Sequence, residues 1–140
     1  MEKINFHSFS EIDLDNYLDQ MIEIDLFYFK DEAWDKSAFK NELPDKKEKS
    51  FIMLLNDQLV GYCVLSRKEG SFHLHKIAVR NNSIQKGLGS KMLDYILVEL
   101  KVDKLTLKVN VNNIFAINFY FKHHFSIKEV KNEYYTMILV

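Results

Sequence analysis

The sequence predicts a single domain of mixed α/β class, with a mostly antiparallel sheet of about seven strands flanked by about four helices. The chain has 140 residues, of which 47% are hydrophobic, so one domain with a self-sufficient core is expected over residues 1–140. Apolar residues alternate along some segments and recur at helical spacing along others. The resulting order of elements is β-α-α-β-β-β-α-β-α-β-β.

The first half of the chain is predicted to form four strands and two helices. Alternating apolar residues predict the strands, over residues 3–9, 51–55, 58–67 and 72–79. Helical spacing predicts a helix over residues 14–22, and a shorter helix is expected over residues 35–43. The charged run at residues 45–49 is expected to be a solvated loop rather than a patch for nucleic acid. Asn56-Asp57 is expected to form a two-residue turn.

The second half is predicted to contain two helices and three strands. The strands are expected over residues 104–109, 125–130 and 134–140. A polar segment, residues 80–86, leads to a helix with an apolar stripe between residues 88 and 100. Asn113 can cap the last helix, which carries the apolar residues Ile114, Ile117 and Phe121.

The composition excludes several classes of function. The net charge is -1, from 19 basic and 20 acidic residues, so no positive field favours nucleic acid. The single cysteine, Cys63, cannot form an internal disulfide, which fits a reducing compartment. The chain has no apolar stretch of about 18 residues, and its start does not resemble a signal peptide. We therefore expect a cytoplasmic protein that does not span a membrane.

Two of the four glycines, Gly87 and Gly89, lie between a predicted strand and a predicted helix. Backbone N–H groups converge at a helix N-terminus, so this order of elements predicts an anion site. Ser90 adds a hydroxyl in the first turn. The spacing matches neither a P-loop nor a dinucleotide-binding fingerprint. The spacing leaves one alternative open: the glycines only relieve steric crowding at the start of the helix, and no ligand binds there.

Four motifs, which cover nearly the whole chain, occur together in one order. The strand end and glycine loop are Ile77-Ala78-Val79 and Gln85-Lys86-Gly87-Leu88-Gly89-Ser90. A strand–Asn–helix–Tyr segment follows at residues 105–125, and Trp34, Phe39 and Glu42-Leu43 precede them. Together they resemble the GNAT N-acetyltransferases, and the early motif resembles the RimI-like branch, which acetylates protein N-termini.

This resemblance implies a fold, a cosubstrate and a reaction. It implies the GNAT fold, with acetyl-CoA as the acetyl donor and no metal. It also implies acetyl transfer to a primary amine, and we expect this amine to be the N-terminal α-amine of a protein or peptide. The residues that match its acetyl-CoA site are Ile77, Ala78, Val79, Gln85, Lys86, Gly87, Leu88, Gly89, Ser90 and Asn113. Tyr120 matches the tyrosine that protonates the leaving thiolate.

Three positions depart from the family pattern. Ile84 replaces the usual Gln or Arg of the loop, and His124 replaces a usual glycine. Lys108 stands where RimI-like enzymes carry a glutamate as general base, and a protonated lysine cannot take a proton from an amine. Some family members place the base four residues before the position of Ile77. That residue is His73, which period two would place on the same strand face as Ile77.

Two other functions and one other site remain open. A GNAT enzyme acting on a small-molecule amine would fit the short Lys131-Asn132-Glu133 turn. A degenerate acyl-CoA-binding module would fit the departures at positions 84 and 108. His73 and His75 share a strand face by period two, but no Cys or acid has a matching spacing, so no metal site is expected.

Overall fold

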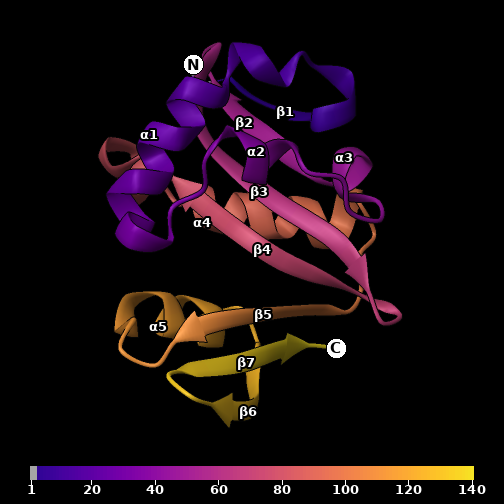
Figure 1. Cartoon of the computed structure of the whole chain (residues 1–140), viewed down its shortest axis with the longest axis vertical. Helices are drawn as coiled ribbons and strands as arrows, with labels where there is room; N and C mark the ends of the chain where they lie inside the picture. The colour runs from indigo at the N-terminus through magenta and orange to yellow at the C-terminus, as the bar shows by residue number, and fades with distance from the viewer. Residues whose placement is uncertain (1–2) are drawn as a thin grey trace.

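The computed structural model describes residues 3–140, except for the side chains of residues 84–86. Seven strands form one sheet in the order β1-β2-β3-β4-β5-β7-β6 (Figure 1). Neighbouring strands are antiparallel, except that β4 and β5 are parallel. The strands are β1 Ile4–Ser8, β2 Phe51–Leu55, β3 Gln58–Lys68, β4 Ser71–Val79, β5 Leu105–Asn110, β6 Ser126–Lys131 and β7 Tyr134–Leu139. The predicted fold class is confirmed.

Helices cover both faces of the sheet and enclose two apolar cores. The α-helices are α1 Leu18–Phe29, α2 Lys36–Lys40, α3 Lys46–Lys49, α4 Leu88–Asp94 and α5 Ile114–Lys122. The larger core packs α4 and α5 against the sheet, and the second core packs α1 and α2 against its other face. Among residues 3–140, no helix is both long and apolar enough to cross a membrane.

The charged run at residues 45–49 is not the solvated loop that its composition predicts. It contains the single-turn helix α3, and Lys46 is only 2% exposed. The Lys46 Nζ donates hydrogen bonds to the carbonyl oxygens of Ala38, Phe39 and Asn41, at 3.1, 2.7 and 2.9 Å. These carbonyls lie at the end of α2 and lack helical partners, so a buried ammonium can satisfy them. Burial lowers the pKa of Lys46 to about 8.

A β-bulge in β4 changes which residues share a face. Leu74 lies opposite Leu65, and Lys76 lies opposite Val64, so His75 is the extra residue in β4. An extra residue reverses the alternation of side chains beyond it. Ile77 therefore packs against the larger core, whereas Lys76 points towards Asp25 of α1.

Strands β4 and β5 pair only at their first residues. The paired positions are Phe72 with Leu105, His73 with Thr106, and Leu74 with Leu107. Beyond these pairs the two strands diverge, and Figure 1 shows their arrowheads lying apart. We call this divergence of the two strand ends the splay; the backbone groups at the end of β4 have no strand partner on the β5 side.

Candidate active site

The end of β4 presents backbone donors to the splay. The N–H of Arg80 donates to the carbonyl oxygen of Val60 in β3, at 2.7 Å. Hydrogen-bonding directions alternate along a strand, so the N–H groups of Ile77 and Val79 point away from β3, towards β5. All three predicted residues therefore lie at an unpaired strand edge, and two of them, Ile77 and Val79, direct their N–H groups towards β5.

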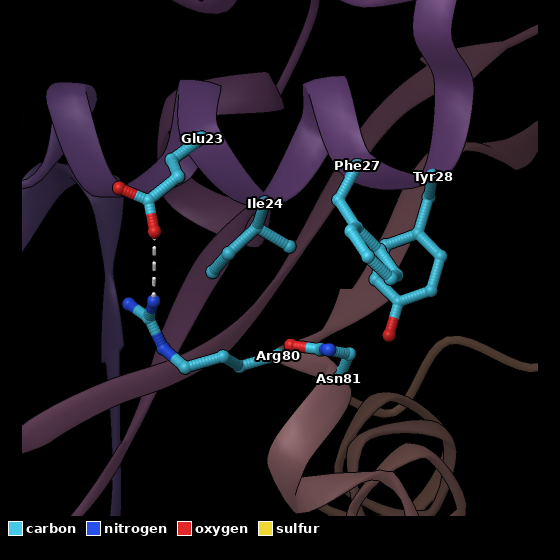
Figure 2. Close-up of a pocket in the computed structure, with 6 residues that line it drawn as sticks. All are labelled: Glu23, Ile24, Phe27, Tyr28, Arg80 and Asn81. Carbon is cyan, nitrogen blue, oxygen red and sulfur yellow. Dashed lines mark hydrogen bonds and ion pairs between the residues drawn. The ribbon is translucent and has the colours of Figure 1, made fainter.

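Helix α1 holds this strand end in place through residues that sequence reasoning missed. The Tyr28 hydroxyl donates to the carbonyl oxygen of Val79 at 2.5 Å, and burial raises the pKa of Tyr28. The Arg80 guanidinium lies 3.5 Å from the Glu23 carboxylate. Figure 2 shows this pair at one end, and Tyr28 at the other, of a pocket between α1 and the end of β4. The helical spacing in the sequence ends at residue 22, whereas α1 continues to Phe29, so Glu23 and Tyr28 lie beyond the predicted helix.

The glycine loop follows as a 3₁₀ helix, η4 (Asn81–Lys86), and the start of α4. Gly87 has φ +70°, and a Cβ there would meet no atom of the described side chains and backbone within 4 Å. Its backbone is therefore open to a ligand, and its conformation favours glycine. A Cβ on Gly89 would instead lie 3.2 Å from Cζ of Phe119, so Gly89 lets α4 pack on α5.

The other predicted loop residues have separate environments. Ser90 lies in the first turn of α4, and its Oγ is 2.9 Å from Nε2 of His123. Leu88 is 1% exposed in the larger core, so only its backbone faces the loop. The side chains of Gln85 and Lys86 lie outside the described residues.

Helix α5 carries the remaining residues of the predicted acetyl-CoA side. Asn113 caps α5, because its Oδ1 accepts a hydrogen bond from the Ala116 N–H at 3.2 Å. This bond uses the amide oxygen and leaves the NH₂ group as a donor. Tyr120 is 7% exposed in the larger core and packs against Phe119 and Phe125. Burial raises its pKa, so the hydroxyl stays protonated at neutral pH.

His73 lies on the opposite face from Ile77, so the prediction of a shared face is wrong. Its Nδ1 is 2.8 Å from the Thr106 Oγ1, and Thr106 alternates with the core residues Leu105 and Leu107. The bulge at His75 is the physical reason for the error. Burial lowers the pKa of His73 to about 4, and His75, Lys68 and Lys108 lower it further.

A buried polar cluster joins α1 to β3 and β4. Asp25 is fully buried and accepts hydrogen bonds from the Tyr62 hydroxyl at 2.5 Å and the Trp34 N–H at 2.7 Å. The Lys76 ammonium lies 3.1 Å from the same carboxylate and 3.7 Å from the centre of the Phe29 ring. This cluster fixes the corner between α1 and α2, and Trp34 is its one member that belongs to a motif described in the sequence.

The family of the chain follows from a comparison of its sequence. The model of the Acetyltransferase (GNAT) family matches residues 14–125, which include both sides of the splay. The chain belongs to the GNAT family. A comparison with curated proteins finds no significant match.

Solved structures share the GNAT fold at low sequence identity. PH1933 from Pyrococcus horikoshii is 20% identical with a TM-score of 0.79, and the match covers 98% of each chain. The ribosomal-protein-S18-alanine N-acetyltransferase from Escherichia coli is 19% identical with a TM-score of 0.75, over 99% of this chain and 93% of that one. Naa50 from Arabidopsis thaliana, in complex with a bisubstrate analogue, is 21% identical with a TM-score of 0.75, over 98% of each chain.

The geometry of this GNAT protein changes what we expect of His73. A group with a pKa of about 4 stays neutral between pH 6 and 9, so its loss should not change the shape of the pH–rate profile there. We expect kcat/KM of His73→Ala to follow the wild-type pH dependence over this range. A mutant that loses activity below pH 7 and recovers above pH 8 would instead establish His73 as the general base.

Proposed function

We propose that this GNAT protein transfers the acetyl group of acetyl-CoA to an N-terminal α-amine of a protein or peptide. The observation that carries the proposal is the splay between β4 and β5, with the N–H groups of Ile77 and Val79 directed into it. The open backbone at Gly87 lies at one end of this strand edge, and Tyr120 lies in the core on the same face as Ile77.

The acetyl-CoA side is assigned to the face covered by α4 and α5. Backbone N–H groups around Gly87 would hold the pyrophosphate, since unpaired donors and the helix dipole favour an anion there. The Ser90 hydroxyl would border it, and Gln85 and Lys86 belong to the same loop. The Asn113 NH₂ group would donate to the pantetheine chain, whose other contacts would be to the edge of β4.

The reaction then needs two proton movements. The neutral amine attacks the thioester carbonyl, and the backbone N–H groups around Val79 stabilise the oxyanion. The carbon–sulfur bond breaks, the acetylated nitrogen loses its proton to water, and Tyr120 supplies a proton to the departing thiolate. The buried Tyr120 suits this role because its raised pKa keeps the proton on the hydroxyl until a stronger base develops beside it.

The acceptor class follows from the position of Lys108. An α-amine has a pKa near 7.7–8.0, whereas the side-chain amine of lysine has a pKa near 10.4. At neutral pH the lysine amine is therefore harder to deprotonate, by about 3 pKa units. Lys108 is exposed on β5 and offers no carboxylate to take that proton, so an α-amine is the better acceptor. The Escherichia coli and Arabidopsis structures, which are named for an alanine N-acetyltransferase and for an analogue joining CoA to a peptide, support the same choice.

The short connection between β6 and β7 favours a second candidate, a small-molecule amine. The strands end at Lys131 and resume at Tyr134, so no long loop is available to grip a peptide. A third candidate, an acyl-CoA-binding module without activity, rests on Ile84 and Lys108.

We place the protein in the cytoplasm, because its single cysteine is free and buried. We also propose that the chain forms one domain.

One assay separates these candidates. Release of free thiol from acetyl-CoA is measured with peptides of free N-terminus, with their N-terminally blocked counterparts, and with polyamines. The proposal predicts turnover of the free peptides and none of the blocked ones. Turnover of polyamines alone would favour the small-molecule enzyme, and acetyl-CoA binding without any turnover would favour the binding module.

A further inference from the structure

The Val79 carbonyl lies on the same edge of β4 as the Val79 N–H. A residue of an antiparallel strand directs its N–H and its C=O to the same side. The Arg80 N–H, one residue later, donates to the carbonyl oxygen of Val60 in β3 at 2.7 Å. The N–H and C=O of Val79 therefore both point away from β3, so this strand end presents a donor and an acceptor side by side to the splay.

These two groups have opposite effects on a negative charge. In the proposed reaction the Val79 N–H stabilises the oxyanion that forms when the amine attacks the thioester. A carbonyl oxygen carries a partial negative charge, so an unbound Val79 carbonyl on the same edge would repel that oxyanion. The strand end therefore requires a donor that occupies the carbonyl oxygen and leaves the N–H free.

The Tyr28 hydroxyl is such a donor. It donates a hydrogen bond to the Val79 carbonyl oxygen at 2.5 Å, from a position 51 residues earlier in the sequence. Figure 2 shows Tyr28 projecting from α1 at one end of the pocket that Arg80 and Asn81 also line. Burial raises the pKa of Tyr28, so at neutral pH its hydroxyl keeps the proton that it donates to the strand.

This bond is the first of two hydrogen bonds that run through one peptide group. Tyr28 donates to the carbonyl of the peptide between Val79 and Arg80, and the N–H of the same peptide donates to Val60. Hydrogen bonds in series polarise the group that they share and strengthen one another. The Tyr28 hydroxyl therefore also tightens the attachment of this peptide to β3, which fixes the direction of the strand end.

Helix α1 presents Tyr28 from a rigid support. Asp25, three residues earlier, is fully buried and binds the Lys76 ammonium of β4 at 3.1 Å and the Tyr62 hydroxyl of β3 at 2.5 Å. Residues three apart lie on the same face of a helix, so α1 is joined to β4 at two points, Lys76 and Val79. The Tyr28 ring packs against the second core, and its hydroxyl thus reaches the strand edge from a fixed position.

We propose that Tyr28 is a positioning residue for acetyl transfer: its hydroxyl occupies the Val79 carbonyl oxygen and thereby holds the Val79 N–H ready for the oxyanion. The inference rests on the proposed acetyltransferase function. It concerns the transition state, because the negative charge on the thioester oxygen develops only there. Loss of the hydroxyl should therefore lower kcat and leave the KM values for acetyl-CoA and for the acceptor nearly unchanged.

The test compares Tyr28→Phe with Tyr17→Phe, because each change removes one hydroxyl and keeps the ring. Both rings pack against the second core, but Tyr17 lies at the start of α1, at the opposite end of the helix from Tyr28. We expect kcat of Tyr28→Phe to fall about tenfold, a part of the roughly 10²–10³-fold that loss of an oxyanion donor costs. Tyr17→Phe should stay within about twofold of the wild type, since it removes no contact with the strand end.

Two measurements by NMR distinguish positioning from general structural damage. The Arg80 amide should exchange faster with solvent in Tyr28→Phe and not in Tyr17→Phe, because its peptide group loses the Tyr28 donor. In the wild type the Tyr28 hydroxyl proton should exchange slowly, since it is held by Val79. A freely exchanging hydroxyl in the wild type would overturn the proposal whatever the variants do.

The kinetic outcomes also separate this inference from the proposed function. Wild-type protein is first titrated with acetyl-CoA by calorimetry and assayed for thiol release with the acceptor panel. If it neither binds acetyl-CoA nor acetylates any acceptor, the proposed function is wrong and the role of Tyr28 fails with it. If the wild type is active, equal kcat values for Tyr28→Phe and Tyr17→Phe overturn the role of Tyr28 alone. A rise in the acceptor KM at unchanged kcat overturns it as well, because the hydroxyl would then serve binding rather than the transition state.

Discussion

Replacement of Tyr120 by Phe is expected to lower kcat by about 10²–10⁴-fold, the usual contribution of a general acid, while acetyl-CoA affinity is kept. The change removes one hydroxyl and almost no volume. Tyr120 packs through its ring against Phe119 and Phe125, and Phe can keep those contacts. The chemical step should therefore be lost while the core remains. Stopped-flow measurement of thiol release in single turnover, with calorimetry for acetyl-CoA, reports the two effects separately.

Tyr95→Phe is the matched control for this experiment. Tyr95 is a partly buried tyrosine whose pKa, like that of Tyr120, is raised by burial. It lies on the segment that follows α4 and stacks on Phe6, with ring centroids 4.1 Å apart. Its kcat should be close to that of the wild type. A Tyr120→Phe variant that also stays within about threefold of wild type, with chemistry rate-limiting, would reduce Tyr120 to a packing residue.

The fold was predictable because its signals are local. Alternation and helical spacing located all seven strands within about two residues, and Asn113 marked the start of α5. Asn56 and Asp57 both have positive φ, at 51° and 67°, as a two-residue hairpin turn requires. Each of these features depends on residues that are close together in the sequence.

The wrong predictions concern relations between distant parts of the chain that a single residue changes. The extra residue at His75 has no local signature, yet it reverses the faces of β4 and separates His73 from Ile77. Lys46 belongs to a run of charges, and only the fold brings its ammonium to the end of α2. Composition describes the average of such a run and not the one side chain that is buried.

The residues proposed to hold acetyl-CoA could be named from the sequence, whereas the contacts on the α1 side of the splay could not. The glycine loop and α5 have recognisable sequence spacing. The α1 side of the splay is built from contacts between distant segments. Tyr28 reaches Val79 across 51 residues, and Tyr134 reaches Glu32 across 102. Even the two glycines of the loop differ, because Gly87 adopts a left-handed backbone conformation and Gly89 allows close helix packing.

Gly87→Val is expected to weaken acetyl-CoA binding by an order of magnitude or more while the protein remains folded. Among the described residues, a Cβ at Gly87 meets no atom within 4 Å, so the added side chain fills open space beside the loop rather than the core. That space is where the pyrophosphate would approach the backbone N–H groups. The left-handed backbone at φ +70° adds strain of about 1–2 kcal/mol for a side chain other than glycine.

Gly70→Val separates this strain from the loss of a binding site. Gly70 has φ +79°, and a Cβ there also meets nothing within 4 Å, but it lies in the turn between β3 and β4. Both variants should lose a similar amount of unfolding free energy in urea, since both force valine into the left-handed region. Only Gly87→Val should lose acetyl-CoA affinity by calorimetry. Equal affinities in the two variants would mean that the pyrophosphate lies elsewhere, because the strain is shared and the position of the side chain is the one difference between them.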